Sequence, residues 1–542
     1  MVRLAALCMV IACARPAVQA PRLATGSSVE RTIAMGETHR YDVELTGDQV
    51  LIAAVDQLGA DVIVSAFGPD GAALAKIDSP TGGKGTEQLR VDAKQPGTYR
   101  IEVTTFPGQR GSYRARVIEI VSAREIAERD AKERAAIEQF FTERRDFVDG
   151  FVAWAREAAV GDDLAGIERV IGDARVIALG EADHGVHEYL AYRNRLAKLL
   201  VEHHGVTAIL LETGFTEAIA VDDYVTGAST ATSRDVAPAV FSWAMPLALR
   251  ANIELVEWLR AHNAKAARKV HVYGIDVPGG RNGVYVESRR AIDAALAYLA
   301  THDPIAHARI EPRLRGLLPK FHTAGYLELD AGQRAQLTSV VAELLAAFKP
   351  LPDSAELRRA RQHAAMGAVL ESFFRQTRER STKQDLADAS LDGIRDATMA
   401  ANVMWALDAE GAGSRAFLFT HNAHARRAAM TAWPAAVPSF VAMGQYLANS
   451  LHGKLVVIGF LHGDGPPTAT LDGLFARVGR PAFLVDLRAA PEPVRAGFDQ
   501  TWRFRHDGFR ALGLDPWWSS HPLRCFDALA FTSKVTEAAY VH

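Results

Sequence analysis

Acidic and imidazole side chains cluster at a few points in the sequence, each directly after a short apolar run. Glu181, Asp183 and His184 follow one such run, Glu212 closes the next, and His421 follows a later one. A histidine titrates near neutral pH, and a neighbouring carboxylate can orient its ring and stabilise its charged form. This combination of residues is typical of general acid–base chemistry.

Each of these residues has an expected catalytic role. We predict that His184 is a general base oriented by Glu181. Glu212, at the tip of an apolar strand, would be costly to bury alone, and Arg193 is its expected partner. His421 is expected to help Arg193 and Glu212 to position water and stabilise charge. One of His421 and His424 could donate to a developing oxyanion or protonate a leaving alkoxide. The predicted catalytic set is His184, Glu181, Glu212, Arg193 and His421.

A second group of side chains is predicted to bind substrate or to support the site. Asp276 ends another apolar run, and Asn422 and His424 closely follow His421. Tyr224 and Trp243 are candidate pocket walls, although core packing is the commoner fate of buried aromatic residues.

The same histidines allow an alternative, metal-dependent chemistry. His421 and His424 are separated by two residues, and with His184 and nearby carboxylates they could ligate a divalent metal ion. The sequence contains no HExxH zinc helix, no GxSxG nucleophile elbow and no glycine-rich phosphate loop before a helix. Because no serine or cysteine is placed as a nucleophile, we expect direct attack by water without a cofactor.

Apolar runs predict the strands that position these residues. The runs at 176–179 and 206–211 indicate buried parallel strands, with a helical pattern between them. Runs at 269–275 and 416–420 are expected to join the same sheet, and runs at 455–460 and 528–531 are expected to be purely structural. Parallel sheets bind ligands at the carboxyl ends of their strands. The four polar strand ends are therefore predicted to meet at one edge.

The chain is long enough for several domains. Residues 1–20 are predicted to be a bacterial secretory signal cut after Ala20. Residues 28–120 alternate as in an all-β sandwich, and residues 121–159 have the pattern of a charged helical connector. Residues 160–542 are predicted to form an α/β domain with a mostly parallel sheet. Amphipathic helices between about 285 and 392 are expected to be an insertion that caps the active edge.

Charge and cysteine usage exclude some partners. The formal net charge is -3 and there is no long basic run, which argues against nucleic acid binding. Cys525 is the one cysteine outside the signal, so no internal disulfide is expected. We predict export to the periplasm or the medium. Residues 10–13 resemble a relaxed lipobox, and lipidation of Cys13 is the one membrane attachment that the sequence suggests.

Several ordered motifs resemble the erythromycin esterase family. They are GEADHGVHEYLAYRNRL, ILLETGFTEAIAVDDYV, VHVYGIDV, FLFTHNAHARR and MGQYLANSLHGKLVVIGF. The resemblance runs from about Val170 to the end of the chain. It implies a metal-independent hydrolase in which a histidine activates water to open an ester or macrolactone, with a role in the response to macrolide antibiotics. The family's site residues match Glu181, His184, Arg193, Glu212 and His421. Residues 28–120 similarly resemble the bacterial pre-peptidase carboxy-terminal type of domain.

One residue departs from the family pattern. Asp183 stands where the family usually has a small or hydroxyl residue, and its carboxylate should make His184 more basic or help to hold a cation. The family is broad, so the resemblance implies a carboxylic ester hydrolase more directly than a macrolide esterase. The small-molecule partner is expected to be an ester or a lactone. A non-catalytic envelope protein that binds a ligand in the same cleft is a further alternative.

Overall fold

The computed structural model describes residues 20–77, 84–105, 110–240, 248–279, 287–381, 389–432, 440–505 and 517–541. The chain divides into two compact units, Met1–Ala135 with Arg510–Leu514 and Ala136–Phe509 with Asp515–His542. Of the predicted signal segment, residues 1–19 lie outside the described residues.

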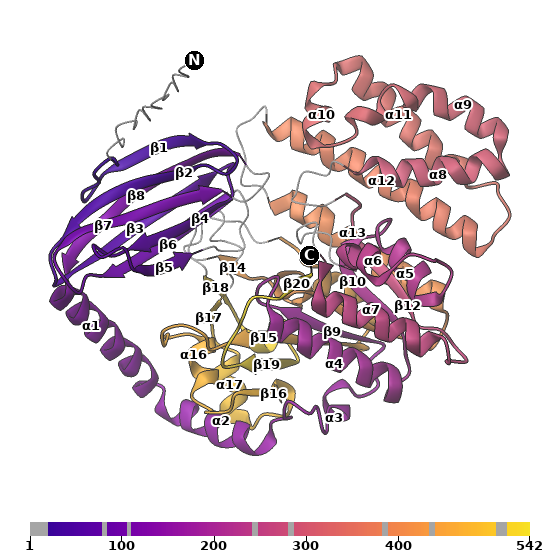
Figure 1. The fold of residues 1–542 in the computed structure, drawn as a ribbon. Helices are drawn as coiled ribbons and strands as arrows, with labels where there is room; N and C mark the ends of the chain where they lie inside the picture. Colours follow the sequence, from indigo (N-terminus) through magenta and orange to yellow (C-terminus); the bar gives the residue numbers. More distant parts are fainter. Residues whose placement is uncertain are drawn as a thin grey trace, which may run out of the picture. The chain divides into compact units, whose positions relative to one another are not determined.

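The first unit is an antiparallel β-sandwich, drawn in indigo and purple in Figure 1. One sheet has the strand order β1-β8-β3-β6 and the other the order β2-β7-β4-β5. Alternate side chains of β2 are buried, as the two-residue period of a strand requires. The predicted sandwich fold is confirmed. Its strands are β1 (Ser28–Ile33), β2 (Thr38–Leu45), β3 (Gln49–Leu58), β4 (Val62–Phe67), β5 (Ala73–Ile77), β6 (Lys84–Asp92), β7 (Gly97–Thr105) and β8 (Gly111–Ser122).

Two helices occupy the stretch where the sequence predicts a helical connector. They are α1 (Ala123–Thr142) and α2 (Arg145–Ala158). Most side chains of α1 are exposed, and Arg124 forms an ion pair with Glu128, one turn further along the helix. The α2 helix has a clearer buried face, which includes Phe151.

The second unit contains a seven-stranded sheet in the order β12-β10-β13-β9-β15-β19-β16. Neighbouring strands are parallel except for the pair formed by β16 and β19. All residues of β9 and β15 are buried, as expected for parallel strands covered on both faces. The predicted α/β fold is confirmed. The strands are β9 (Val176–Glu181), β10 (Val206–Gly214), β12 (His271–Asp276), β13 (Arg415–His421), β15 (Leu455–His462), β16 (Ala482–Asp486) and β19 (Ala528–Thr532).

The ends of these strands differ from the expected ones. Gly180 was expected to stop β9, but the strand continues to Glu181. A side-chain carbon at Gly180 would lie 2.2 Å from Oδ1 of Asn422, so glycine is required for this close approach. The β15 strand continues to His462, and the antiparallel edge strand β16 is an element that the apolar runs did not indicate.

Helices cover the faces of the sheet, and short strands complete the unit. In α4, the apolar face that includes Tyr189, Leu196 and Leu200 packs into the main hydrophobic core. The helices outside the insertion are α3 (Glu168–Ile171), α4 (His187–His203), α5 (Ala218–Thr226), α6 (Ser233–Val236), α7 (Arg250–Asn263), α13 (Ala389–Glu410), α14 (Asn422–Ala425), α15 (Met443–Leu451), α16 (Leu471–Ala476), α17 (Glu492–Phe498) and α18 (Pro522–Cys525). The short strands are β11 (Ala248–Leu249), β14 (Thr431–Ala432), β17 (Trp502–Arg505), β18 (Trp517–Ser520) and β20 (Tyr540–Val541).

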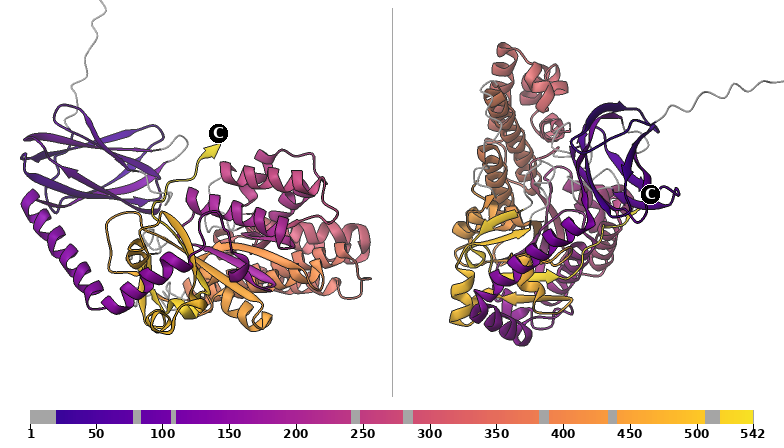
Figure 2. Two further views of the ribbon diagram at one scale, coloured as in Figure 1. Left: turned by 90° about the horizontal axis from the view of Figure 1, so that it is seen from below. Right: turned by 90° about the vertical axis from the view of Figure 1, so that its left-hand side faces the viewer.

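The helical insertion between β12 and α13 has a hydrophobic core of its own. Its helices lie side by side in Figure 1 and in the right-hand view of Figure 2. The helix α12 also reaches the segment after β10, because His363 hydrogen bonds to Thr216 and its ring packs against Phe215. Among the described residues, no helix combines the length and the apolar character needed to cross a membrane. The insertion helices are α8 (Arg289–His302), α9 (Pro304–Arg315), α10 (Thr323–Glu328), α11 (Ala331–Ala347) and α12 (Ala355–Ser381).

Candidate active site

An acid–imidazole pair forms where β9 ends. Glu181 is the last residue of β9, and His184 lies in the turn that leads into α4. Nδ1 of His184 is 2.7 Å from Oε1 of Glu181. The Glu181 side chain is buried, whereas that of His184 is 37% exposed, so water can reach the ring. With Nδ1 donating to Glu181, Nε2 is the ring nitrogen placed to exchange a proton with a reactant.

Negative charge around the pair makes His184 unusually basic. Burial opposes protonation of the ring, but the hydrogen bond and the charge of Glu181 outweigh this effect. The charges of Glu212 and Asp183 act in the same direction, and together they raise the pKa of His184 to about 9. Asp183 also accepts a 2.9 Å hydrogen bond from the backbone N–H of His184. The sequence predicted that the Asp183 carboxylate would make His184 more basic, and its charge raises the pKa of the ring.

The second carboxylate oxygen of Glu181, Oε2, is buried and forms no hydrogen bond with any residue that the structure describes. Burial raises the pKa of the Glu181 carboxyl, while the hydrogen bond from His184 and its charge oppose this rise. An unsatisfied buried carboxylate oxygen is costly, and a water molecule or a substrate hydroxyl would relieve that cost.

His421 lies beside His184 but is held by the backbone. The two ring centroids are 5.0 Å apart, in an edge-to-face arrangement. Nε2 of His421 donates to the carbonyl oxygen of Ala182 at 2.9 Å, and Nδ1 accepts from the N–H of Ala423 at 3.1 Å. Both ring nitrogens are therefore engaged in a neutral imidazole. This geometry suits a positioning residue better than the predicted proton donor.

Glu212 anchors the other side of the site. Its Oε2 accepts hydrogen bonds from the Thr420 hydroxyl at 2.7 Å and from the backbone N–H of His421 at 2.8 Å. Its Oε1 accepts from Nη2 of Arg395 at 2.9 Å. Burial opposes ionisation, but the positive charge of Arg395 and the hydrogen bond from the backbone N–H of His421 hold the pKa of Glu212 well below its usual range.

The cation that pairs with Glu212 is Arg395 rather than the expected Arg193. Arg395, on α13, also binds Asp276 through Nε at 2.9 Å and Nη2 at 2.6 Å. Asp276 has no solvent exposure, so this bidentate pair compensates a fully buried carboxylate. The predicted strand-end acids Glu212 and Asp276 thus meet through a residue of a distant helix.

Arg193 is buried in a different environment. Its guanidinium group donates to the side-chain oxygens of Asn194 and Asn252, and it lies over the ring of Phe419. Burial lowers the pKa of Arg193 to about 10, and the charge of Glu181 opposes this decrease. Arg193 therefore acts on the acid–imidazole pair through its charge and not through a contact with Glu212.

His424 continues the network behind Arg395. Nε2 of His424 accepts from Nη1 of Arg395 at 2.9 Å, which places the ring proton on Nδ1. Nδ1 faces the Asp396 carboxylate at 2.9 Å, and Asp396 in turn accepts from the N–H of Met443. His424 is thus a link between two residues of α13 and not an exposed acid or base.

Two further predicted residues have structural contacts. Asn422 bridges to β15, with its amide donating to the carbonyl of Phe460 and accepting from the N–H of the same residue. Tyr224 is buried in α5, where the guanidinium group of Arg260 lies over its ring. The Asn422 side chain therefore links the start of α14 to β15, and Tyr224 is part of the packed core. Trp243 lies outside the described residues.

Sequence reasoning missed two residues of this network and one further buried histidine. Arg395 and Asp396 had a visible signal, because they form a charged pair at the start of an otherwise apolar helical stretch. Nothing in the spacing indicated that they would reach residues of two strands, β10 and β12, and His424 of α14. His462 was missed because β15 was expected to end at Phe460. It is buried, its N–H faces Asp472 at 3.4 Å, and its Nδ1 lies 3.5 Å from Arg505.

The arrangement of the histidines does not resemble a metal site. The nitrogens of His421 and His424 already bind protein groups, and Nδ1 of His184 binds Glu181. Within the parts of the chain that the structure describes, no three His, Cys, Asp or Glu side chains are grouped so that they could hold a metal ion. The geometry fits acid–base chemistry by His184 better than metal ligation.

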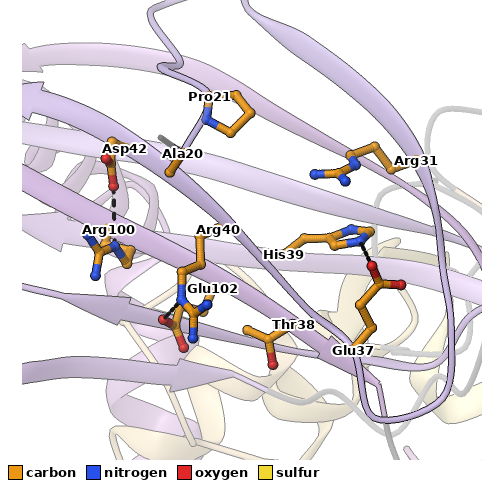
Figure 3. A pocket seen from close by; sticks show the side chains of 10 residues that line it. All are labelled: Ala20, Pro21, Arg31, Glu37, Thr38, His39, Arg40, Asp42, Arg100 and Glu102. Atoms are coloured by element: carbon orange, nitrogen blue, oxygen red, sulfur yellow. Dashed lines mark hydrogen bonds and ion pairs between the residues drawn. The ribbon is translucent and has the colours of Figure 1, made fainter. Parts of the chain in front are cut away.

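A separate polar cleft lies in the first unit (Figure 3). Its volume is about 820 Å³. Its charged side chains pair with each other across neighbouring strands, as in Arg40 with Glu102 and Arg100 with Asp42. The lining residues are Ala20, Pro21, Arg31, Glu37, Thr38, His39, Arg40, Asp42, Arg100 and Glu102.

The histidine of this cleft is not available for acid–base chemistry. Nε2 of His39 lies 3.0 Å from Glu37, and Nδ1 lies 2.7 Å from the Tyr113 hydroxyl. The ring is almost fully buried and both of its nitrogens are bonded. The end of β9 in the second unit is thus the better candidate for catalysis.

Comparisons with known proteins identify the family of the chain. The sequence model of the erythromycin esterase family matches residues 201–535, a region that begins within α4, after His184. The chain is 25% identical over 348 residues to erythromycin esterase type II of Escherichia coli. The alignment covers 61% of this chain and 78% of that protein. The chain is 31% identical over 113 residues to erythromycin esterase type I of Escherichia coli, which covers 21% of this chain and 26% of that protein.

Solved structures share the fold of the second unit. A Bacillus cereus protein aligns with a TM-score of 0.61 and 19% identity, over 73% of this chain and 99% of its own. A mutant of the erythromycin esterase EreC in its open conformation aligns with a TM-score of 0.54 and 18% identity, over 69% of this chain and 94% of its own. At these identities the likeness shows the fold alone.

Proposed function

Because the chain belongs to the erythromycin esterase family, we propose that it is a hydrolase that opens a carboxylic ester or a macrolactone by direct attack of water. The observation that carries the proposal is the 2.7 Å hydrogen bond between Glu181 and His184 at the carboxyl end of β9. A histidine oriented by a buried acid and partly open to solvent is the arrangement that general-base catalysis requires.

In the proposed reaction, Nε2 of His184 takes a proton from water while the water oxygen bonds to the carbonyl carbon. Glu181 stabilises the imidazolium ion that forms. The tetrahedral intermediate then collapses as the bond to the leaving oxygen breaks, and the imidazolium ion protonates that oxygen. The products are a carboxylic acid and an alcohol, which remain in one molecule when the substrate is a lactone. His184 returns to its starting state.

The remaining network positions the base in this proposal. Glu212 holds the backbone N–H of His421, and the His421 ring packs against that of His184. Arg395 in turn holds Glu212 and Asp276. These buried contacts fix the His184 ring without taking part in proton transfer, in the way that supporting residues preorganise other active sites.

We propose macrolides as the first substrates to test, because both curated relatives are named erythromycin esterases. Inactivation of a macrolide would give the protein a role in the response to such antibiotics. Export to the periplasm or the medium remains a proposal, as does attachment through Cys13. Simpler esters and lactones belong in the same test, since a family can keep its chemistry while the substrate changes.

The decisive experiment screens the purified protein against macrolides, lactones and simple esters, with His184→Ala in parallel. We expect His184→Ala to lower kcat by about 10²–10⁴-fold while the circular dichroism spectrum is unchanged. His203→Ala, an exposed position on α4, is the matched control and should retain full activity.

Two outcomes would reject the proposed function. Activity retained in His184→Ala would exclude this histidine as the base. Stoichiometric binding of a lactone by the unmodified protein, without turnover of any ester or lactone, would support a ligand-binding protein.

A further inference from the structure

The polar cleft of the first unit is lined by residues of two edge strands (Figure 3). β1 is the edge strand of one sheet of the sandwich, and β2 is the edge strand of the other. Arg31 of β1 lines the cleft together with Thr38, His39, Arg40 and Asp42 of β2. An edge strand presents backbone N–H and C=O groups that no neighbouring strand binds. The cleft can therefore offer a ligand backbone groups as well as side chains.

One position on the edge of β2 is already paired. The N–H of Asp42 donates to the carbonyl oxygen of Pro21 at 3.0 Å, and the carbonyl oxygen of Asp42 accepts from the N–H of Leu23 at 2.9 Å. The residue between them, Arg22, forms a parallel bridge with Asp42. An extended segment of the chain itself therefore lies against this edge, beside the cleft.

The next edge positions along β2 have no such partner. β2 pairs with β7 in an antiparallel ladder, in which successive residues turn their backbone groups alternately toward the partner strand and away from it. Asp42 turns its backbone groups away from β7, so Arg40 and Thr38 do the same. Among the described residues, no group hydrogen bonds to the backbone of Arg40 or Thr38 on that side. The edge between these two residues can accept a further strand.

The side chains of the cleft include one guanidinium group that has no partner. Arg40 pairs with Glu102 at 2.7 Å, and Arg100 pairs with Asp42 at 3.3 Å. Arg31 is exposed, and its side chain forms no hydrogen bond or ion pair with any residue that the structure describes. Figure 3 shows its guanidinium group apart from both ion pairs.

The remaining carboxylate of the cleft, that of Glu37, is occupied by other donors. Its Oε2 accepts from the N–H of Ala34 at 2.9 Å, and its Oε1 lies 3.0 Å from Nε2 of His39. These hydrogen bonds, first that of Ala34, lower the pKa of Glu37 and keep it ionised at neutral pH. Because both oxygens are engaged, a carboxylate that forms paired hydrogen bonds with Arg31 has to come from a ligand.

We propose that this cleft binds an extended acidic peptide segment of another protein, which adds a strand to β2. The backbone of the peptide pairs with Thr38 and Arg40, and one of its carboxylates binds Arg31. The cleft volume of about 820 Å³ is within the range of sites that enclose a ligand. Two sandwiches that joined edge to edge would need a flat approach, so a recessed edge favours a single strand. The site lies in the first unit and is separate from the proposed hydrolytic site.

The test uses fluorescence anisotropy of a labelled peptide with blocked ends, which alternates valine with glutamate, and the whole protein. We expect saturable 1:1 binding. The same peptide with lysine in place of glutamate should bind at least about tenfold more weakly, because it cannot pair with Arg31. A version of the acidic peptide that is methylated on its backbone nitrogens has no donors for the edge. It should also bind at least about tenfold more weakly.

A first pair of variants tests the contact with the carboxylate. Arg31→Gln removes the guanidinium group and should weaken binding of the acidic peptide by about tenfold. Arg90→Gln is the matched control, since it removes the same charge from an exposed position on β6, outside the cleft. It should bind the peptide as the unmodified protein does.

A second pair of variants tests the strand edge. Thr38→Pro removes an N–H that does not bond to β7, and proline is tolerated at the first position of an edge strand. We expect it to weaken binding by at least about tenfold without changing the circular dichroism spectrum. Thr38→Val keeps the N–H and should bind normally. The methylated peptide tests the same contact without any change to the protein.

Several results would overturn the proposal. It is wrong if the acidic peptide does not bind, or if the lysine peptide or the methylated peptide binds as tightly. It is also wrong if Arg31→Gln or a folded Thr38→Pro binds the acidic peptide normally. A dimer in analytical ultracentrifugation that Thr38→Pro abolishes would show that a second copy of the chain occupies the edge, and would overturn the assignment to a peptide of another protein.

Discussion

Glu181 and His421 lie opposite each other in the parallel ladder between β9 and β13. This register brings the turn that carries His184 beside the His421 ring, and it lets Nε2 of His421 bond to the carbonyl of Ala182. Strand pairing therefore sets the relation between the proposed base and the group that supports it. The geometry of the site is thus a property of the sheet as much as of the loops around it.

The pH dependence of turnover should follow the ionisation of His184. Its pKa is raised to about 9, so the imidazolium form predominates at neutral pH and only its neutral form can accept a proton. We expect kcat/KM to rise with pH, to reach half of its maximum near pH 9 and to level off above that pH. The measurement is kcat/KM for a stable ester substrate between pH 6 and about pH 10. A plateau already reached below pH 7 would contradict this ionisation.

Asp183→Asn should move that profile to lower pH. The charge of Asp183 favours the protonated ring, whereas an asparagine keeps an oxygen that can accept from the His184 N–H. The matched control is Asp149→Asn, which removes an exposed carboxylate from α2 and should leave the profile in place. A profile that is equally unchanged in both variants would show that Asp183 does not tune the base.

Arg395→Met should destabilise the fold strongly. It would leave the buried carboxylates of Glu212 and Asp276 without a cation, which costs about 3–5 kcal/mol in free energy of unfolding. Arg193→Met should cost less, because its hydrogen-bond partners among the described residues are asparagine and carbonyl oxygens. Urea denaturation of both variants measures the difference. Equal losses would mean that the ion pairs of Arg395 are not what stabilises this region.

Gly180→Ala should disturb the contact between β9 and Asn422. The added carbon would lie 2.2 Å from Oδ1 of Asn422, and the resulting overpacking should cost about 1–3 kcal/mol. In the double variant with Asn422→Ala, the clash with the amide is gone, so the combined loss should be smaller than the sum of the single losses. Strict additivity in a double-mutant cycle would argue against this contact as the cause.

A chelator should leave turnover unchanged. The ring nitrogens of His421 and His424 are bonded to protein groups, so these residues are not arranged as metal ligands. The assay compares kcat before and after incubation with excess EDTA, followed by gel filtration. Loss of activity that added zinc restores would instead favour the metal-dependent alternative.

The strands of the second unit were predictable from sequence because they are buried on both faces. Such strands read as continuous apolar runs, so polar residues that follow them mark the carboxyl edge of the sheet. This logic places Glu181, Glu212, Asp276 and His421 at strand ends, as the structure does. The last one or two residues of each strand were less visible, because polar residues there resemble the start of a loop.

The contacts among those residues could not be predicted in the same way. Arg395 reaches Glu212 and Asp276 because α13 packs on the sheet. The distance between α13 and the strands cannot be read from the sequence. The bonding of His421 depends on two backbone groups, whose positions follow from the register of β13 with β9. Residue types and strand ends were thus readable, whereas pairing between distant elements required coordinates.

The helices α8–α12 have a hydrophobic core of their own, and this affects how the protein unfolds. This core is separate from the core around the sheet and meets the sheet side in contacts such as the cluster of Phe215, Ala291 and Met366 and the hydrogen bond of His363 with Thr216. We therefore expect the insertion to unfold as its own cooperative unit. Amide protons of these helices should then exchange with solvent earlier than those of the parallel strands. Such independence would also let evolution remodel the insertion between relatives while the sheet edge keeps its chemistry.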